Sequence, residues 1–297
     1  MVADVTPIVR ELLPLLRLFC RGEYGVALGG AHAKGIDDRE SDVDLYVFAR
    51  EVLSADERTR LCQRYADGVE SVVSWGESDG FIQGGTDFSF RQQRIECWLR
   101  NTDYVSGIIA ACREGVVKHD LVTWTVMGFY NYCTLSDLHK MIPVEDPQGF
   151  LSRWKSEVSV YPPRLGEAII AAHLHAAQFW PDNPHYKGAI ERCDIIYTAG
   201  IVQQVAHNLI QVVFALNKVY FPGEKRLDVT MDHLPLKPDR FTERIIHLIS
   251  PGVRADRAFL RGQRGELGKL VGEAASLVAD RCQCAQTMLH CGPPCAL

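Results

Sequence analysis

Residues 28–45 read LGGAHAKGIDDRESDVDL, and this stretch decides the fold. Its last residues open an apolar run, VDLYVFA (43–49), that is typical of a β-strand. Side chains alternate between the two faces of a strand, so Asp42 and Asp44 leave one face while Val43 leaves the other. Two carboxylates side by side repel each other unless a cation lies between them. The pair therefore predicts a site for Mg²⁺, which prefers hard oxygen ligands.

Two glycines precede the carboxylates. The apolar run that begins at Tyr24 ends in Gly29 and Gly30, and a glycine turn lets backbone N–H groups approach an anion closely. A glycine pair alone is usually only a turn, and a D-x-D pair alone is often a solvated strand face. Together they predict a site for a nucleoside triphosphate, because phosphates commonly complete the shell of a bound Mg²⁺.

The segment GGAHAKGIDDRESDVDLYVF (29–48) resembles the signature of the DNA polymerase β-like nucleotidyltransferases, a glycine–serine turn followed by D-x-D at the start of a strand. It is most similar to small bacterial enzymes that adenylylate antibiotics, such as the aminoglycoside and lincosamide nucleotidyltransferases. Where that family has serine after the second glycine, this chain has Ala31, which removes a hydrogen bond worth about 1.5–3 kcal/mol. The resemblance implies a site for the donor nucleotide at Gly29, Gly30, Ala31, Lys34 and Ser41, although Ser41 equally suits a turn.

The resemblance also implies a third carboxylate, from a later strand of the same sheet. In RIECWL (94–99), alternation buries the apolar residues and directs Glu96 to the opposite face, so Glu96 is our choice. Asp87, on the preceding strand, is the rival. The alternative for Glu96 is an exposed strand residue paired with Arg94 or Arg100.

The implied reaction moves a nucleoside monophosphate, AMP by preference, from a nucleoside triphosphate to a hydroxyl of a small molecule such as an antibiotic. Asp42 and Asp44 hold one Mg²⁺ with the triphosphate, and a second ion shared with Glu96 activates the acceptor hydroxyl while pyrophosphate leaves. Two alternatives stay open. One is the same chemistry on a protein or RNA acceptor, and the other, suggested by Ala31, is a nucleotide-binding regulator without catalysis.

The first hundred residues mix strand and helix patterns, with strands expected at 24–30, 43–49, 86–90 and 94–99 and helices from Thr6 and at 54–66. From residue 121 the pattern is helical, with blocks at 150–158, 165–180, 190–220, 241–249 and 254–281. We therefore predict an α+β chain. A nucleotidyltransferase domain, residues 1–118, has a small mixed β-sheet flanked by helices, and an all-α helical-bundle domain, residues 119–297, binds the acceptor.

The helical half offers three basic side chains for the donor's phosphates. Lys187 and Arg192 lie in HYKGAIERCD, where helical spacing also places Glu191 and Asp194 nearby. Lys225 follows a long apolar helix and resembles the lysines that reach triphosphates from the helical domains of related enzymes. The alternatives are a salt-bridged helix surface for the first pair and a solvated lysine for Lys225.

Composition narrows the partners and the compartment. The 297 residues include 32 Lys and Arg against 37 Asp and Glu, a net charge of −5, which disfavours nucleic acid as a partner. Charges interrupt any secretory signal at the N-terminus, and polar residues interrupt the apolar stretch 195–216, which predicts a buried helix and no membrane span. We expect a cytoplasmic protein with reduced thiols. Its Cys-rich tail, 282–295, matches no common zinc module and is expected to fray. The oligomeric state stays open.

Overall fold

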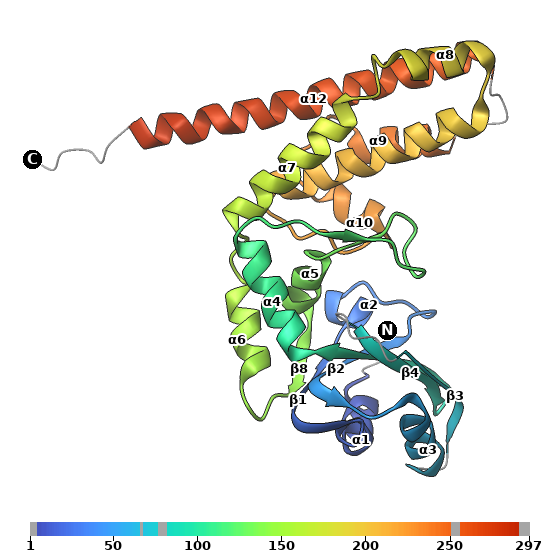
Figure 1. Ribbon diagram of the computed structural model, residues 1–297, viewed down its shortest axis with the longest axis vertical. Coiled ribbons are helices and arrows are strands. Elements are labelled where there is room, and N and C mark those ends of the chain that lie inside the picture. Colours follow the sequence, from blue (N-terminus) through green and yellow to red (C-terminus); the bar gives the residue numbers. More distant parts are fainter. Residues whose placement is uncertain (1–4, 66–67, 77–81, 251–255, 291–297) are drawn as a thin grey trace, which may run out of the picture. The chain divides into compact units, whose positions relative to one another are not determined.

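The computed structural model describes residues 5–65, 68–76, 82–250 and 256–290, with side chains up to residue 281. It is mixed α and β, with one central sheet and many helices (Figure 1). The chain divides into two compact units. Unit 1 comprises Met1–Cys112 and Asn131–Val160, and unit 2 comprises Arg113–Tyr130 and Tyr161–Leu297.

Unit 1 is built on a six-stranded mixed sheet in the order β3-β4-β5-β2-β1-β8. Strands β2 and β5 are parallel, whereas the other neighbouring strands are antiparallel. The centre of the sheet therefore brings two strands that are far apart in sequence into parallel register. The strands are β1 (Cys20–Leu28), β2 (Val43–Val52), β3 (Val69–Trp75), β4 (Ile82–Phe90), β5 (Gln93–Asn101) and β8 (Ile142–Glu145).

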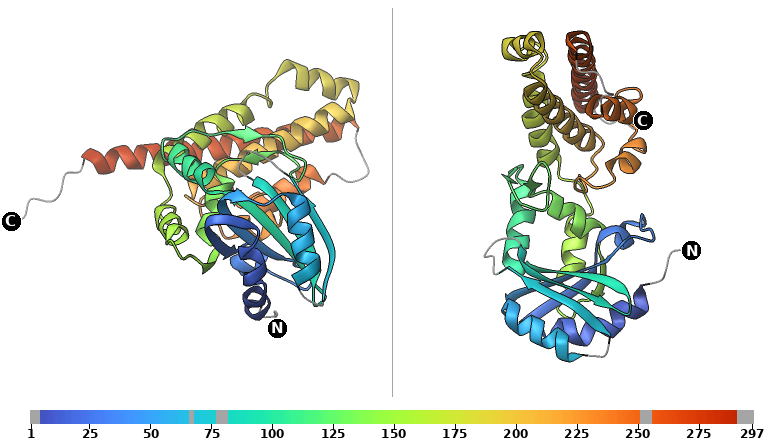
Figure 2. Two further views of the ribbon diagram at one scale, coloured as in Figure 1. Left: turned by 60° about the horizontal axis from the view of Figure 1, so that its bottom comes forward. Right: turned by 90° about the vertical axis from the view of Figure 1, so that its right-hand side faces the viewer.

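Helices α1 (Thr6–Arg17) and α3 (Ala55–Tyr65) cover one face of this sheet (Figures 1 and 2). Val43 and Leu45 of β2 are fully buried in the core against them, as are Ile95 and Cys97 of β5. Each large apolar side chain buried in this way contributes about 1.5–3 kcal/mol to stability. The alternation predicted for both strands is confirmed, and it directs the side chains between these residues to the opposite face.

The remaining helices of unit 1 are α2 (Gly30–Lys34), α4 (Thr102–Arg113), α5 (Cys133–Lys140) and α6 (Phe150–Glu157). Strand β8 pairs with β1 and forms an edge of the sheet. Residues 131–160, which the sequence placed in the helical domain, therefore pack in unit 1. A single boundary near residue 118 does not describe the structure, because the chain returns to complete the sheet.

Unit 2 is mostly helical. The unit also contains a short two-stranded sheet, β6 (His119–Asp120) with β7 (Phe129–Tyr130), so it is not the all-α domain that was predicted. Its helices are α7 (Pro163–Gln178), α8 (Pro184–Arg192), α9 (Ile195–Leu216), α10 (Leu227–Asp232), α11 (Phe241–Ile249) and α12 (Arg257–His290).

Helix α9 forms the centre of unit 2. It packs against α7, α8, α11 and α12, and 15 of its residues are buried. Among the described residues it is the one helix with the length and composition to cross a membrane, but 78% of its apolar stretch is buried inside the structure. This burial fits the core helix that the sequence predicted.

The described cysteines carry free thiols. Cys62, Cys97, Cys112 and Cys133 are buried, as expected for small core residues, and burial raises the pKa of the Cys62 thiol to about 12. The predicted tail of cysteines, 282–295, lies outside the residues whose side chains are described.

Candidate metal and nucleotide site

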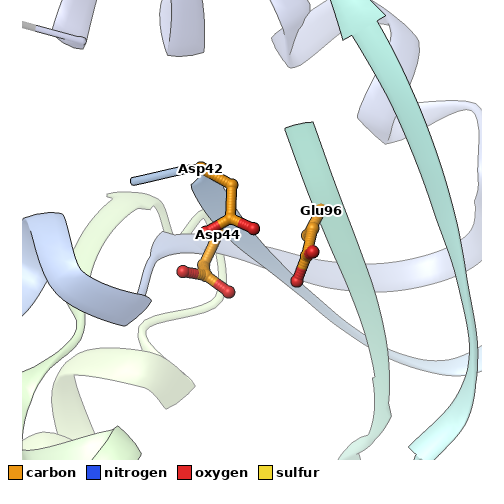
Figure 3. Close-up of side chains that lie close together, drawn as sticks. All are labelled: Asp42, Asp44 and Glu96. Carbon is orange, nitrogen blue, oxygen red and sulfur yellow. The ribbon is translucent and has the colours of Figure 1, made fainter. Parts of the chain in front are cut away.

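Three carboxylates converge where β2 and β5 run side by side. Asp44 lies in β2 directly opposite Glu96 of β5, and Asp42 immediately precedes β2. One carboxylate oxygen from each residue lies within 4.8 Å of the other two. Figure 3 shows the three side chains close together beside the two strands. The structure thus brings together the three residues chosen from the sequence, and their oxygens can surround one hard cation.

Glu96 is a weaker acid than an ordinary glutamate, because it is buried beside two other carboxylates. Its side chain is only 16% exposed. Burial, a hydrogen bond with Asp42 and the charges of Asp42 and Asp44 raise the pKa of Glu96 to about 7. A divalent cation between the carboxylates would remove this repulsion, so the donor set fits Mg²⁺ both in ligand type and in charge.

One arginine contacts the cluster. Arg94 lies two residues before Glu96 on β5, and its Nη2 is 2.5 Å from Glu96 Oε1 and 3.9 Å from Asp42 Oδ2. The ion pair with Arg94, considered above as the alternative for Glu96, is therefore present within the cluster. Arg100, the other candidate, donates instead to Asp137 of α5 at 2.8 Å.

The glycine turn packs directly on Asp44. Gly30 has a φ of +56°, and a Cβ added there would lie 1.6 Å from Asp44 Oδ2. Gly29 donates its N–H to the backbone oxygen of Asp44 at 2.8 Å. Only glycine satisfies both the positive φ and the close approach at position 30. The turn and the carboxylate thus form one rigid unit.

A buried polar chain supports this turn from the sheet. Tyr46 lies two residues after Asp44 on the same face, and its hydroxyl accepts the Gly30 N–H at 3.3 Å. The Arg100 guanidinium lies 3.9 Å from the centre of the Tyr46 ring, and Asp137 binds that guanidinium. Sequence reasoning missed these supporting residues. The spacing of Tyr46 from Asp44 was a usable signal, whereas the pairing with Asp137 depends on the tertiary fold.

The predicted phosphate contacts of Gly29 and Gly30 stay predictions, and the structure shows which groups within the protein their N–H groups meet. The N–H groups of Gly29 and Gly30 are used within the protein, by Asp44 and Tyr46. The first turn of α2 instead presents the N–H groups of Ala31 and His32, which have no acceptor within the helix.

The other two residues proposed for the donor lie nearby in sequence. Lys34 is in the last turn of α2. Ser41 closes a turn, because its hydroxyl accepts the Asp38 N–H at 2.9 Å and donates to the Asp38 carboxylate at 3.1 Å. The structure therefore shows Ser41 as a turn residue, which was the alternative to a role in binding the nucleotide.

Asp87, the rival to Glu96, has a different environment. It lies on β4 directly opposite Glu96, and its carboxylate accepts a hydrogen bond from Trp75 Nε1 at 3.2 Å. Burial raises its pKa. Glu96, and not Asp87, has its oxygen within 4.8 Å of both Asp42 and Asp44.

The basic residues predicted from the helical half all lie in unit 2, and each is exposed. Lys187 pairs with Asp182 at 3.3 Å, and Arg192 is the last residue of α8. Lys225 lies between α9 and α10. Their roles toward a nucleotide stay predictions.

The predicted helix from residue 190 to 220 is interrupted. Cys193 adopts a left-handed conformation with a φ of +53°, and this ends α8. Asp194 then caps α9 by accepting the Tyr197 N–H, while Glu191 binds Arg261 through both carboxylate oxygens. Glu191 and Asp194, expected on one face of a continuous helix, therefore lie at the junction of α8 and α9, where each makes its own contacts.

The raised pKa of Glu96 predicts pH-dependent metal binding. Because a cation must displace the proton that Glu96 holds up to about pH 7, we expect the affinity for Mg²⁺ to increase about ten-fold from pH 6 to pH 8. Titration calorimetry at three pH values measures this, and Glu96→Gln should flatten the profile. An affinity that is constant over this range would contradict the assignment of Glu96 as a ligand.

Comparison with known proteins adds limited information. A family profile described as a domain of unknown function (DUF4037) matches residues 134–227, less than half of the chain. No curated protein matches. Among solved structures, the chain is similar to a nucleotidyltransferase-like protein from Exiguobacterium sibiricum 255-15, with 9% identity, 93% of this chain and 78% of that chain covered, and a TM-score of 0.43. These matches assign the chain to no family.

Proposed function

We propose that this protein is a metal-dependent nucleotidyltransferase of the DNA polymerase β-like type, which moves a nucleoside monophosphate from a nucleoside triphosphate to a hydroxyl of a small molecule. The observation that carries the proposal is the cluster of Asp42, Asp44 and Glu96 against the Gly29–Gly30 turn. The resemblance suggests ATP as the donor and an antibiotic-like molecule as the acceptor. The sequence pattern suggests that the reaction takes place in the cytoplasm.

The chain's own residues suit this reaction in three ways. Asp42, Asp44 and Glu96 would hold Mg²⁺, which neutralises the charge that develops on phosphate oxygens. The first turn of α2 presents backbone N–H groups to an anion. Gly30 lets that turn lie directly against Asp44, so groups that would bind the triphosphate and the metal lie side by side.

A second candidate function rests on Ala31, which stands where the resembled family has serine. A catalytically silent regulator would bind nucleotide without transferring it. The cluster favours the enzyme, because burial of Glu96 beside the charges of Asp42 and Asp44 raises its pKa to about 7, and this arrangement destabilises the protein without a cation. A binding protein has less need of that arrangement.

The test is titration calorimetry of ATP, GTP, CTP and UTP with Mg²⁺ on the parent protein and on the double variant Asp42→Ala/Asp44→Ala. We expect metal-dependent binding that the double variant loses. Glu40→Ala is the matched control, since Glu40 is an exposed carboxylate of the same loop. A screen of hydroxylated acceptors, antibiotics first and then protein and RNA, follows with pyrophosphate release as the readout.

Each outcome has a definite meaning. Binding that the double variant retains would show that the nucleotide site lies elsewhere. Binding without pyrophosphate release for any acceptor class would favour the regulator. Pyrophosphate release only with a protein or RNA acceptor would support nucleotidyl transfer but would show that the acceptor is not a small molecule.

A further inference from the structure

Arg94 holds an unusual position for a residue beside metal-binding carboxylates. Its Nη2 contacts Glu96 Oε1 at 2.5 Å and lies 3.9 Å from Asp42 Oδ2, and both residues belong to the three carboxylates that could hold a metal ion. A guanidinium and a divalent cation beside the same two carboxylates repel each other, because both are positively charged. Metal binding therefore competes with this ion pair.

The side chain of Arg94 is free to leave. It is 69% exposed, whereas Glu96 is 16% exposed and Asp42 28%. An ion pair with so exposed a partner contributes about 0–1 kcal/mol, so little opposes its exchange. Once displaced, the guanidinium would stay near the cluster, because Arg94 lies on the same strand, two residues from Glu96. A planar guanidinium binds phosphate oxygens through two parallel hydrogen bonds.

We propose that Arg94 is an exchangeable counter-ion: it pairs with Glu96 and Asp42 while they hold no metal, and it moves to the phosphates of the donor nucleotide when the metal binds. This inference rests on the proposed function. It adds a phosphate-binding residue for which the sequence predicted no role in the reaction. Metal binding then releases the Arg94 guanidinium for the phosphates.

The test exploits two effects of opposite sign. In Arg94→Gln, Mn²⁺ alone should bind about three-fold more tightly, because a competing cation is gone. The Mg²⁺ complex of an ATP analogue with a non-cleavable α–β bridge should bind at least about ten-fold more weakly, because a charged hydrogen-bond donor is lost. Arg94→Lys keeps the charge but not the paired donors, so it should bind Mn²⁺ like the parent and the analogue more weakly.

Arg50→Gln is the control. Arg50 is 72% exposed and pairs with Asp103, which is not part of the cluster, so both affinities should equal those of the parent. Thermal unfolding of each variant checks that the fold is kept.

The outcomes separate the inference from the proposed function. If the parent binds Mn²⁺ and the analogue in a manner that depends on Asp42 and Asp44, but Arg94→Gln leaves both affinities unchanged or weakens both, the role of Arg94 is wrong and the proposed function stands. If the parent shows no such binding, the proposed function is wrong and the inference with it.

Discussion

Replacement of Gly30 by alanine is expected to abolish metal-dependent nucleotide binding. The new Cβ would lie 1.6 Å from Asp44 Oδ2 and 2.3 Å from Asp44 Cγ, so the turn and the carboxylate could not keep their positions. The φ of +56° adds about 1–2 kcal/mol of backbone strain for a residue with a side chain. Calorimetry with Mg²⁺ and ATP, together with thermal unfolding, measures both effects.

Gly35→Ala separates strain from collision. Gly35 ends α2 with a φ of +67°, and a Cβ there would meet no atom within 4 Å. Its alanine variant should therefore lose stability by a similar strain but keep nucleotide binding. If Gly30→Ala binds nucleotide as the parent does, the close contact between this glycine and Asp44 does not define the site.

Asp44→Asn is expected to lower nucleotidyl transfer by about 10³-fold or more while it stabilises the protein in the absence of metal. Loss of a charged ligand removes charge stabilisation of the transferring phosphate. The same change relieves repulsion with Glu96, whose pKa is raised in part by the charge of Asp44. Relief of about 1 kcal/mol raises the unfolding temperature by about 2–4 °C in a domain of this size.

Two measurements check this prediction: pyrophosphate release with an accepted substrate, and thermal unfolding with and without Mg²⁺. The opposite directions of the two effects exclude misfolding as the cause of lost activity. Glu40→Gln should change neither quantity. Lower stability of the metal-free Asp44→Asn variant would mean that its carboxylate makes favourable contacts that outweigh the repulsion.

The sequence predicted the centre of the sheet because the relevant information there is local. Alternation in β2 buries Val43 and Leu45 and directs Asp44, which lies between them, to the opposite face, and β5 repeats this pattern around Glu96. The register of Asp44 with Glu96 follows from the parallel pairing of the two strands. Short-range periodicity thus placed Asp44 and Glu96 on their strand faces, whereas the search for a third carboxylate came from the family resemblance.

The edge of the sheet was not predictable in this way. Strand β8 has four residues, includes Pro143, and shows no buried position, so its pattern does not distinguish it from a loop. Its pairing with β1 is a tertiary property. The same holds for Asp137, which reaches Arg100 from 37 positions along the chain. The contact of Arg94 with Asp42 likewise depends on strand pairing.

The return of the chain to unit 1 has a consequence for any attempt to isolate this unit. A fragment ending at residue 118 would lack β8 and leave one side of β1 unpaired, an open edge that can join the strands of other molecules and aggregate. The fragment would also lose Asp137, leaving Arg100 without its carboxylate in a position that is 4% exposed. Proteolytic cuts within 113–130 with both pieces retained would spare these contacts, whereas truncation would not.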